Sequence, residues 1–542
     1  MRRELLIVFA AAVVLYLPSV RYGYVQDDRA IIVSNPAAHS IGAALGAFDD
    51  PYWPRESGAG LYRPVTILSF AIDWTLSGGR AGWFHAMNAL WHGLVTVLFV
   101  LVLVRWLPLL AAAGAGLVFA WHPVHVEAVA TIVGRAELLA AAGILGAVLA
   151  ARRGWWVVAV LLAALAMFSK EHGVIAGVVI LIDRWLQSPE TYGPGVRTPR
   201  GLWIGLGIVT VGFLVAWSAV GVAGASAPAA VFYGRDTVGR LAIALPAVLQ
   251  AGLLLVLPVS LSSDYSPQVI PAYEGISLAA VLGFLIVVAT PALVIAYRRR
   301  APAVSFTAGL AALSFLPTSN LLFAGGIVLA ERNLYLAVAL PAALLGAAIA
   351  RFEHPRTTHD ARRTAVPRTT HDVRRTAVPR TTHDARRTMT VALGALVAIA
   401  CALLSFVRLP AWRDNRTQLL TLLAEHPESY LGHASAAAVL AGRGDSAGAR
   451  HQYRLADSLF AGDPYLDAAH AIFLLGVGDT AGAGPLIARI RTRTEAPATR
   501  MALRAQFLFD LRRGDLLAAR AIADSARRRF PADEGWYRLY LQ

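Results

Sequence analysis

Charged residues are scarce in this chain of 542 residues. Only 15% of its residues are charged and 57% are hydrophobic, whereas soluble domains usually carry about 25% charged residues. Apolar runs, many of them near the length needed to cross a bilayer, recur from the N-terminus to about residue 409. This composition excludes an ordinary soluble domain. We therefore predict an all-α, polytopic membrane helix bundle over residues 1–409.

Cysteine and lysine are almost absent. Cys401 is the single cysteine, so an intramolecular disulfide is excluded. Lys170 is the single lysine among 49 basic side chains, and the net charge of +15 is therefore carried by arginine. Many of these arginines lie in short loops between apolar runs, as is typical of cytoplasmic loops. We accordingly predict a lipid bilayer, and no nucleic acid, as the partner of this basic chain.

The apolar runs predict eleven spans. They lie at about 4–21, 85–104, 107–121, 138–151, 155–169, 173–187, 202–224, 276–297, 302–323, 333–350 and 390–409. The first is taken as an uncleaved span because no small-x-small cleavage site follows it. All arginine-rich loops can be cytoplasmic only if the apolar segment 240–260 does not make a simple crossing. The N-terminus is then cytoplasmic, and the C-terminus and the polar loops are extracytoplasmic.

Two segments carry repeats. A twelve-residue unit that starts at Pro355 recurs from Pro367 and Pro379, and it predicts a tolerant, arginine-rich cytoplasmic loop over 355–388. Near-identical copies with few apolar residues favour disorder over metal binding by their histidines. Beyond residue 410, Gly-Asp pairs and prolines recur at a period near 34, which is typical of tetratricopeptide helix pairs. Residues 410–542 are thus predicted to form an extracytoplasmic helical repeat domain.

Several polar residues stand at predicted helix ends on the extracytoplasmic side. Asp27 and Asp28 follow the first span, where a carboxylate could take a proton from an incoming hydroxyl or simply cap a helix. Lys170 could bind a phosphate as a point charge or form an ion pair with Glu171.

Further along this side, His122, His125 and Glu127 lack a fourth metal partner at a defined spacing, which favours hydrogen bonding or structural roles. Arg135 and Glu137 could form an exposed ion pair. Asp264, Tyr265 and Glu331 can be interfacial anchors, and Arg332 is a plausible phosphate ligand.

Ordered motifs along residues 27–335 resemble the transmembrane and tetratricopeptide-repeat O-mannosyltransferases, a family of the GT-C glycosyltransferase class. The matching stretches are Asp27-Asp28, Tyr62-Arg-Pro-Val-Thr-Ile-Leu-Ser-Phe70, Phe84-His-Ala-Met-Asn88, His122-Pro-Val-His-Val-Glu-Ala-Val-Ala130, Ile132-Val-Gly-Arg-Ala-Glu-Leu-Leu-Ala140, Lys170-Glu171, Ser263-Asp-Tyr-Ser266, Leu316-Pro-Thr-Ser-Asn-Leu-Leu-Phe323, Glu331-Arg332 and Leu334-Tyr335. The insertion 355–388 and the short repeat array depart from the family pattern.

The resemblance implies transfer of a sugar, mannose or a similar hexose, from a polyprenyl-phosphate donor to a hydroxyl of a polypeptide or glycan acceptor. Asp27 or Asp28 would be the base, and the set Lys170, Arg332, Arg63 and Arg135 would bind the donor phosphate. The set His85, His122, His125, Glu127, Glu171, Asp264 and Tyr265 would bind the substrates, and neither a cofactor nor a metal is expected.

The near-absence of lysine is compatible with a GC-rich genome, hence with a bacterial cytoplasmic membrane. Two alternatives remain open at this point, a lipid-linked sugar flippase and a non-catalytic scaffold that presents the repeats.

Overall fold

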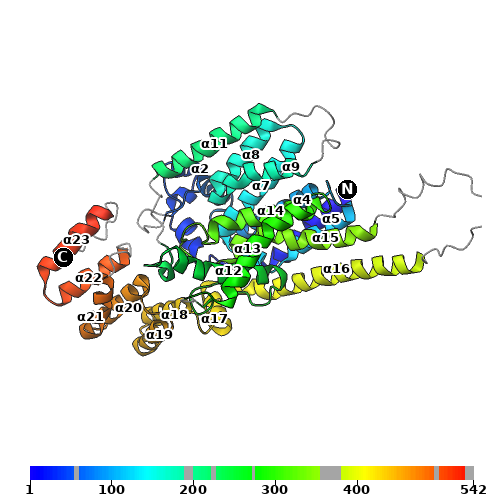
Figure 1. Ribbon diagram of the computed structural model, residues 1–542. Helices are drawn as coiled ribbons and strands as arrows, with labels where there is room; N and C mark the ends of the chain where they lie inside the picture. The colour runs from blue at the N-terminus through cyan, green and yellow to red at the C-terminus, as the bar shows by residue number, and fades with distance from the viewer. Residues whose placement is uncertain are drawn as a thin grey trace, which may run out of the picture.

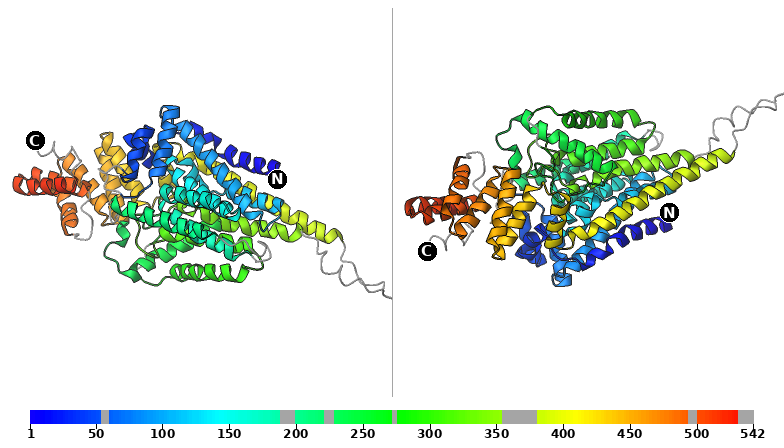
Figure 2. Two further views of the ribbon diagram at one scale, coloured as in Figure 1. Left: turned by 90° about the horizontal axis from the view of Figure 1, so that it is seen from above. Right: turned by 90° about the horizontal axis from the view of Figure 1, so that it is seen from below.

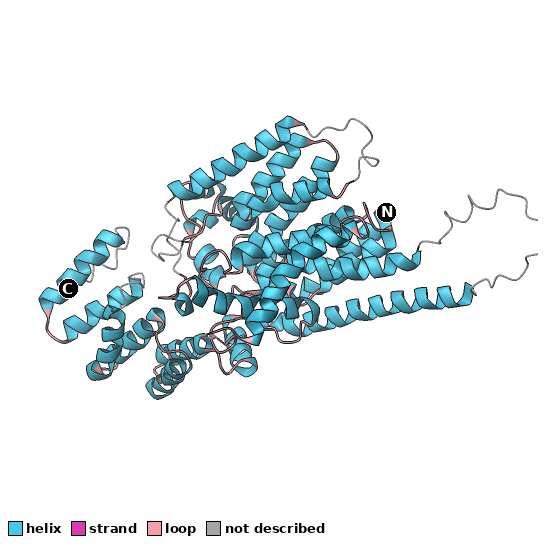
Figure 3. Cartoon of the chain, in the orientation of Figure 1, coloured by secondary structure: helices cyan, strands magenta, loops and turns pink. Residues whose placement is uncertain are grey.

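The computed structural model describes residues 1–53, 60–187, 199–220, 228–271, 275–353, 380–492 and 500–530. Within these ranges every regular element is a helix (Figure 3), which confirms the all-α prediction. In the described part of the chain, seven helices are long and apolar enough to cross a membrane: α1 (Arg2–Tyr16) with η1 (Leu17–Arg21), α4 (Ala81–Leu103), α7 (Arg135–Arg152), α11 (Arg200–Ala219), α12 (Thr237–Val256), α13 (Leu278–Tyr297) and α16 (Arg380–Arg408). Shorter apolar helices are α5 (Leu109–Trp121), α8 (Trp156–Ser169), α14 (Pro302–Phe315) and α15 (Ala339–Glu353). Helix α9 (Ala176–Trp185) follows α8 in the chain.

Arginine-rich turns gather at one end of the bundle. Arg152, at the end of α7, pairs with Asp183 of α9 at 2.6 Å and covers the ring of Trp106 at 4.7 Å. Arg298, after α13, covers the ring of Trp185 at 5.2 Å. The N-terminus, the end of α15 and the start of α16 lie at the end of the molecule away from the tail (Figures 1 and 2).

The polar loops meet at the opposite end, beside the tail. Residues far apart in the sequence are joined there by hydrogen bonds or ion pairs: Asp28 to Val133 (2.8 Å), Arg63 to Glu171 (2.8 Å), Arg332 to Glu127 (2.8 Å) and Glu331 to Ser262 (2.6 Å). The bundle therefore has one arginine-rich end and one end that collects the predicted site residues.

Helix α12 begins and ends near the same loop. The Ala229 N–H, before α12, donates to the Gly325 carbonyl at 2.8 Å, and the Ser262 N–H, after it, donates to Glu331 at 2.6 Å. Gly325 and Glu331 belong to one connection, between α14 and α15. Both ends of α12 are thus attached to one connection, although its length and composition would allow it to cross a membrane. That segment 240–260 makes no simple crossing stays a prediction.

The segment 21–84, predicted to be an outer loop, contains a helix that was not predicted from the sequence. Helix α3 (Pro64–Ser77) starts with a proline at its first position, where the missing N–H costs no hydrogen bond. Its Thr66 hydroxyl donates to the Ser169 carbonyl at 2.8 Å, which attaches α3 to the end of α8. Short turns η3 (Pro36–Ala38), α2 (Ile41–Ala44) and η4 (Leu45–Phe48) precede it.

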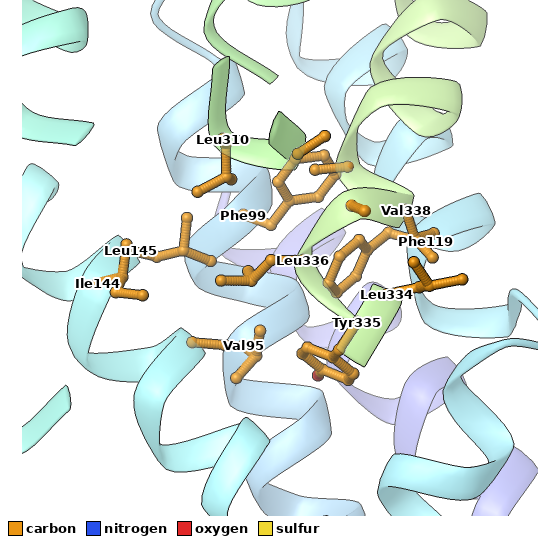
Figure 4. Close-up of a cluster of buried hydrophobic side chains, with 14 of the residues drawn as sticks. Val95, Phe99, Phe119, Ile144, Leu145, Leu310, Leu334, Tyr335, Leu336 and Val338 are labelled. Atoms are coloured by element: carbon orange, nitrogen blue, oxygen red, sulfur yellow. The ribbon is translucent and has the colours of Figure 1, made fainter. Parts of the chain in front are cut away.

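A continuous apolar core supports the polar end. Figure 4 shows Val95, Phe99, Phe119, Leu145 and Tyr335 in this cluster, from helices α4, α5 and α7 and the turn that precedes α15. That turn comprises η10 (Glu331–Leu334) and η11 (Leu336–Val338), and the Tyr335 hydroxyl hydrogen-bonds His92 Nδ1 at 2.7 Å. Burial of Tyr335 and its neighbours thus holds the segment that carries Arg332.

The tail consists of paired helices. After η12 (Leu409–Trp412) come α17 (Asn415–Glu425), α18 (Tyr430–Gly442), α19 (Ser446–Leu459), α20 (Pro464–Gly476), α21 (Thr480–Thr492), α22 (Arg500–Arg512) and α23 (Leu516–Arg529). In the turns within pairs, Gly444 (φ 83°) and Gly514 (φ 74°) are left-handed, and the following aspartates cap the next helix. This explains the Gly-Asp period, and the fold matches the predicted tetratricopeptide-like array.

Residues 354–379, which hold the first two copies of the twelve-residue repeat, lie outside the described residues. The predicted end of the loop 355–388 is wrong, because α16 already begins at Arg380, within the third copy of the repeat. Two predicted spans were also too long: α11 ends at Ala219 rather than 224, and α14 ends at Phe315 rather than 323.

Candidate functional site

The two adjacent carboxylates have different environments. Asp28 is fully buried, and its two oxygens accept the N–H groups of Val25 at 3.0 Å and Val133 at 2.8 Å. Val133 lies in a 3-10 turn that ends at Gly134, where any side chain would collide with the Ala128 backbone. Burial raises the pKa of Asp28 to about 7. Asp28 therefore ties the loop that follows η1 to the start of α7.

Asp27 is half-buried and accessible. Across the described ranges it forms neither a hydrogen bond nor an ion pair. It lies within electrostatic reach of Arg332 and Tyr52. A carboxylate that is accessible, near a cation and not otherwise engaged is available to accept a proton.

Arg332 belongs to a group of three cations from separate loops, and each of the three has a carboxylate partner. Arg63 contacts Glu171 through Nε and Nη2 at 2.8–3.2 Å. Arg332 contacts Glu127 through its backbone N–H and Nη1, both at 2.8 Å. Lys170 pairs with Glu137 and also donates to Asn333 Oδ1 at 3.1 Å. Arg63 and Arg332 each influence the Lys170 ammonium electrostatically, so the three cations form one cluster.

The three cations differ in how open they are. The exposed fraction of the side chain is 28% for Arg332, 14% for Arg63 and 8% for Lys170. Among the described residues, the Arg332 guanidinium is engaged only through Nη1, which leaves Nε and Nη2 as donors. Arg332 is therefore best placed to receive an anion.

Lys170 is a buried ion-pair residue rather than an open point charge. It ends α8, and the sharp turn after it needs Gly173, since a side chain there would collide with the Ala166 backbone. Its partner is Glu137, whereas the sequence suggested Glu171. His172 Nε2 lies 3.7 Å from the same Glu137 carboxylate.

Arg135 lies beneath the cluster and does not reach it. Its side chain is 1% exposed, pairs with Asp73 at 2.8 Å, and donates to Asn88 and to the Phe84 carbonyl. The idea of an exposed Arg135–Glu137 ion pair is wrong, because both side chains are buried and bind different partners. This arrangement makes Arg135 a structural link between α3, α4 and α7.

The three predicted substrate-binding histidines are buried and bind backbone carbonyls. His85 Nε2 contacts the Gly23 oxygen at 3.2 Å, His122 Nε2 the Leu255 oxygen at 3.2 Å, and His125 Nε2 the Tyr335 oxygen at 2.9 Å. The described residues contain no group of three or more His, Cys, Asp or Glu side chains that could hold a metal ion. These histidines join loops, and of the motif's three polar residues only Glu127 lies in the cation cluster.

Asp264 and Tyr265 lie where the 257–271 loop meets the tail. Asp264 Oδ2 accepts the hydroxyls of Ser266 at 2.6 Å and of Ser429, at the start of α18, at 2.5 Å. The Tyr265 hydroxyl donates to Glu331 Oε1 at 2.9 Å. Glu331 is fully buried, and burial raises its pKa to about 8. The two residues thus support the junction rather than the cation cluster.

Sequence reasoning missed Tyr52 and Asn333. Tyr52 is 3% exposed, its ring lies 5.0 Å from the Arg63 guanidinium, and it has electrostatic contact with Asp27 and Glu171. Asn333 links the lysine to the Arg332 turn. Neither could be predicted from its neighbours in the sequence. Asn333 enters the site through Lys170, 163 positions away, and Tyr52 enters it through the Arg63 side chain.

Comparison with known proteins finds similar chains that are named protein O-mannosyl-transferases. Protein O-mannosyl-transferase F38B6.6 of Caenorhabditis elegans is 29% identical over 352 residues, covering 62% of this chain and 49% of the relative. Protein O-mannosyl-transferase TMTC4 of Homo sapiens is 29% identical over 397 residues, covering 61% of this chain and 53% of the relative. The resemblance to the O-mannosyltransferase family is confirmed.

Similarity to these O-mannosyltransferases is partial in extent. The chain spans about half, or less, of the length of the curated relatives that it matches. A shorter match with higher identity, 40% over 135 residues, covers 24% of this chain and 14% of protein O-mannosyl-transferase Tmtc2 of Drosophila melanogaster. No family model and no solved structure matches the chain.

Proposed function

We propose that this protein is a membrane glycosyltransferase that moves a hexose, mannose by analogy with its relatives' names, from a polyprenyl-phosphate donor to a hydroxyl. The observation that carries the proposal is Asp27. It is a half-buried carboxylate with no hydrogen-bond partner in the described part of the chain, within electrostatic reach of Arg332, and Arg332 belongs to the cluster of three cations.

In the proposed reaction Asp27 accepts the proton of the acceptor hydroxyl. The hydroxyl oxygen attacks the anomeric carbon of the donor sugar and forms the new glycosidic bond. The bond between that carbon and the phosphate oxygen breaks, and polyprenyl phosphate leaves with the electron pair. Asp28 holds the loop that carries Asp27 through its bonds to Val25 and Val133.

Negative charge develops on the leaving phosphate, and Arg332 is the residue we assign to it. Its Nε and Nη2 donate no hydrogen bond among the described residues, and its side chain is the most exposed of the three cations. Arg63 adds a second guanidinium within electrostatic reach of Arg332, and Lys170 adds a third positive charge to the cluster. Such fixed cations stabilise a transition state without reorganisation.

We infer that this chemistry occurs on the extracytoplasmic face. Support comes from the arginine-rich turns at one end of the bundle and the site at the other, since cytoplasmic loops are enriched in arginine. The tail, which leaves the same end as the site, would then be extracytoplasmic too. Alkaline phosphatase fused to the C-terminus should be active and a cytoplasmic fluorescent reporter dark; the reverse pattern would contradict this orientation.

The acceptor we favour is a Ser or Thr hydroxyl of a polypeptide, with a glycan hydroxyl as the alternative. The relatives are named protein O-mannosyl-transferases, and paired-helix repeats form concave surfaces that suit peptides. A polypeptide held by the tail would lie next to Asp27, because the tail contacts the loop that carries it.

The decisive experiment is sugar transfer in membranes that contain the full chain, with a panel of polyprenyl-phosphate sugars as donors. Transfer from one donor class, lost in Asp27→Asn, supports the enzyme. A lipid-linked sugar flippase would move donor across the membrane without forming product. A scaffold would show no transfer with any donor, and loss of Asp27 would change nothing.

A further inference from the structure

The start of the tail contacts the loop that carries Asp27. The Gly23 N–H donates to the Arg413 carbonyl at 3.1 Å, and the Gln26 N–H donates to Asn415 Oδ1 at 2.7 Å. Asn415 is the first residue of α17, and the side chain of Asp414 caps that helix by accepting the Thr417 N–H. Gln26 and Asn415, which are 389 positions apart in the sequence, are thus joined next to the proposed base.

Gln26 has an unusual backbone conformation. Its φ is 47°, in the left-handed region that residues other than Gly, Asn and Asp rarely adopt. Asp27 follows directly, so the φ of Gln26 sets the direction in which Asp27 leaves the chain. The Asp28 carboxylate accepts the backbone N–H groups of Val25 and Val133, whereas Asp27 has no such restraint among the described residues. The direction of Asp27 therefore depends on what holds Gln26 in place.

We propose that Asn415 is a positioning residue for Asp27, so that the tail completes the site of the membrane domain. The inference rests on the proposed function, in which Asp27 accepts the proton. The hydrogen bond from Gln26 to Asn415 stabilises the left-handed turn and keeps the carboxylate directed toward the cation cluster. Asn415 itself does not touch the reacting atoms.

A purely structural role for Asn415 would have a different signature, and the same helix provides the control. Gln418 lies one turn further along α17, and its Nε2 donates to Ser263 Oγ at 2.5 Å. That contact also attaches the tail to an outer loop, but the loop does not carry a proposed catalytic residue. If Asn415 only docks the tail, its loss and the loss of Gln418 should have the same effect.

The test measures turnover and donor KM in full-length Asn415→Ala, Asn415→Asp and Gln418→Ala. Because a net hydrogen bond corresponds to roughly a twofold to tenfold change, kcat should fall by that factor in Asn415→Ala with donor KM unchanged. Asn415→Asp keeps an oxygen acceptor and should stay near wild type, as should Gln418→Ala. Equal losses in Asn415→Ala and Gln418→Ala, or wild-type kcat in Asn415→Ala, would overturn the proposal.

A second variant tests the backbone directly. Glycine adopts positive φ at no steric cost, so adding Gln26→Gly to Asn415→Ala should raise kcat above that of the single variant. A double variant no faster than the single one would count against control through Gln26.

Amide hydrogen exchange of the peptide that covers residues 22–28 gives a readout independent of turnover. It should speed up in Asn415→Ala and not in Gln418→Ala. If the wild type transfers no sugar but this exchange pattern holds, the proposed function fails while the positioning contact stands. Unchanged exchange in an active enzyme would overturn the positioning role alone.

Discussion

Replacing each of the paired carboxylates with its amide should separate catalysis from stability. Asp27→Asn keeps the shape of a half-buried side chain that has no hydrogen-bond partner in the described residues. Its effect on the free energy of unfolding should stay within about 0.5 kcal/mol, as for ordinary surface substitutions. Turnover should fall by about 10²–10⁴, because an amide cannot accept the proton of the acceptor hydroxyl.

Asp28→Asn should instead destabilise the fold. Both Asp28 oxygens accept backbone N–H groups, from Val25 at 3.0 Å and from Val133 at 2.8 Å. An amide has a single oxygen, so one buried N–H would face an NH2 group. Leaving a buried donor unsatisfied costs about 1–3 kcal/mol. Turnover of the molecules that remain folded should fall less than in Asp27→Asn.

The assay pairs thermal unfolding in detergent with sugar transfer per folded molecule. Asp445→Asn is the matched control: it makes the same chemical change at the cap of α19, where asparagine caps as well as aspartate. A stable Asp28→Asn protein with turnover reduced about a hundredfold, beside a near-normal Asp27→Asn, would refute the assignment and make Asp28 the base.

Four further outcomes are expected. Arg332→Ala should weaken donor binding about tenfold to a hundredfold, as for a charge-assisted hydrogen bond, with partial recovery in Arg332→Lys; unchanged donor KM would remove Arg332 from the phosphate site. Lys170→Ala leaves Glu137 buried without its cation and should cost about 3–5 kcal/mol in unfolding, and the cost should shrink when Glu137→Leu is added. Burial raises the pKa of Glu331 to about 8, so the folded wild type should lose stability as pH rises from about 4 to 8, whereas Glu331→Gln should show a flatter unfolding temperature over that range. Deleting residues 355–379, which spares α16, should leave insertion and turnover near normal, and a loss of either would reveal a role for the repeat.

The sequence by itself determined the class of the fold and the grouping of arginine-rich loops at one end of the bundle. The length of an apolar run and the period of Gly-Asp turns are local properties, so both can be recognised from the sequence alone. Arginine placement also predicted which loops belong together, and the contacts of Arg152 and Arg298 agree with that grouping. Helix α3 was not predicted, because polar residues, Asp73 among them, interrupt its apolar run and its contact with the end of α8 joins distant parts of the sequence.

Only the tertiary structure decided the role open to each polar residue. Asp27 and Asp28 are neighbours with the same side chain, and they differ because Val133, 105 positions from Asp28, donates to one of them. Proximity in the sequence suggested an ion pair between Lys170 and Glu171, but in the folded chain Lys170 pairs with Glu137. Whether a charge is paired, buried or open depends on groups that folding brings from other loops, and burial amplifies that difference because desolvation penalises any charge left without a partner.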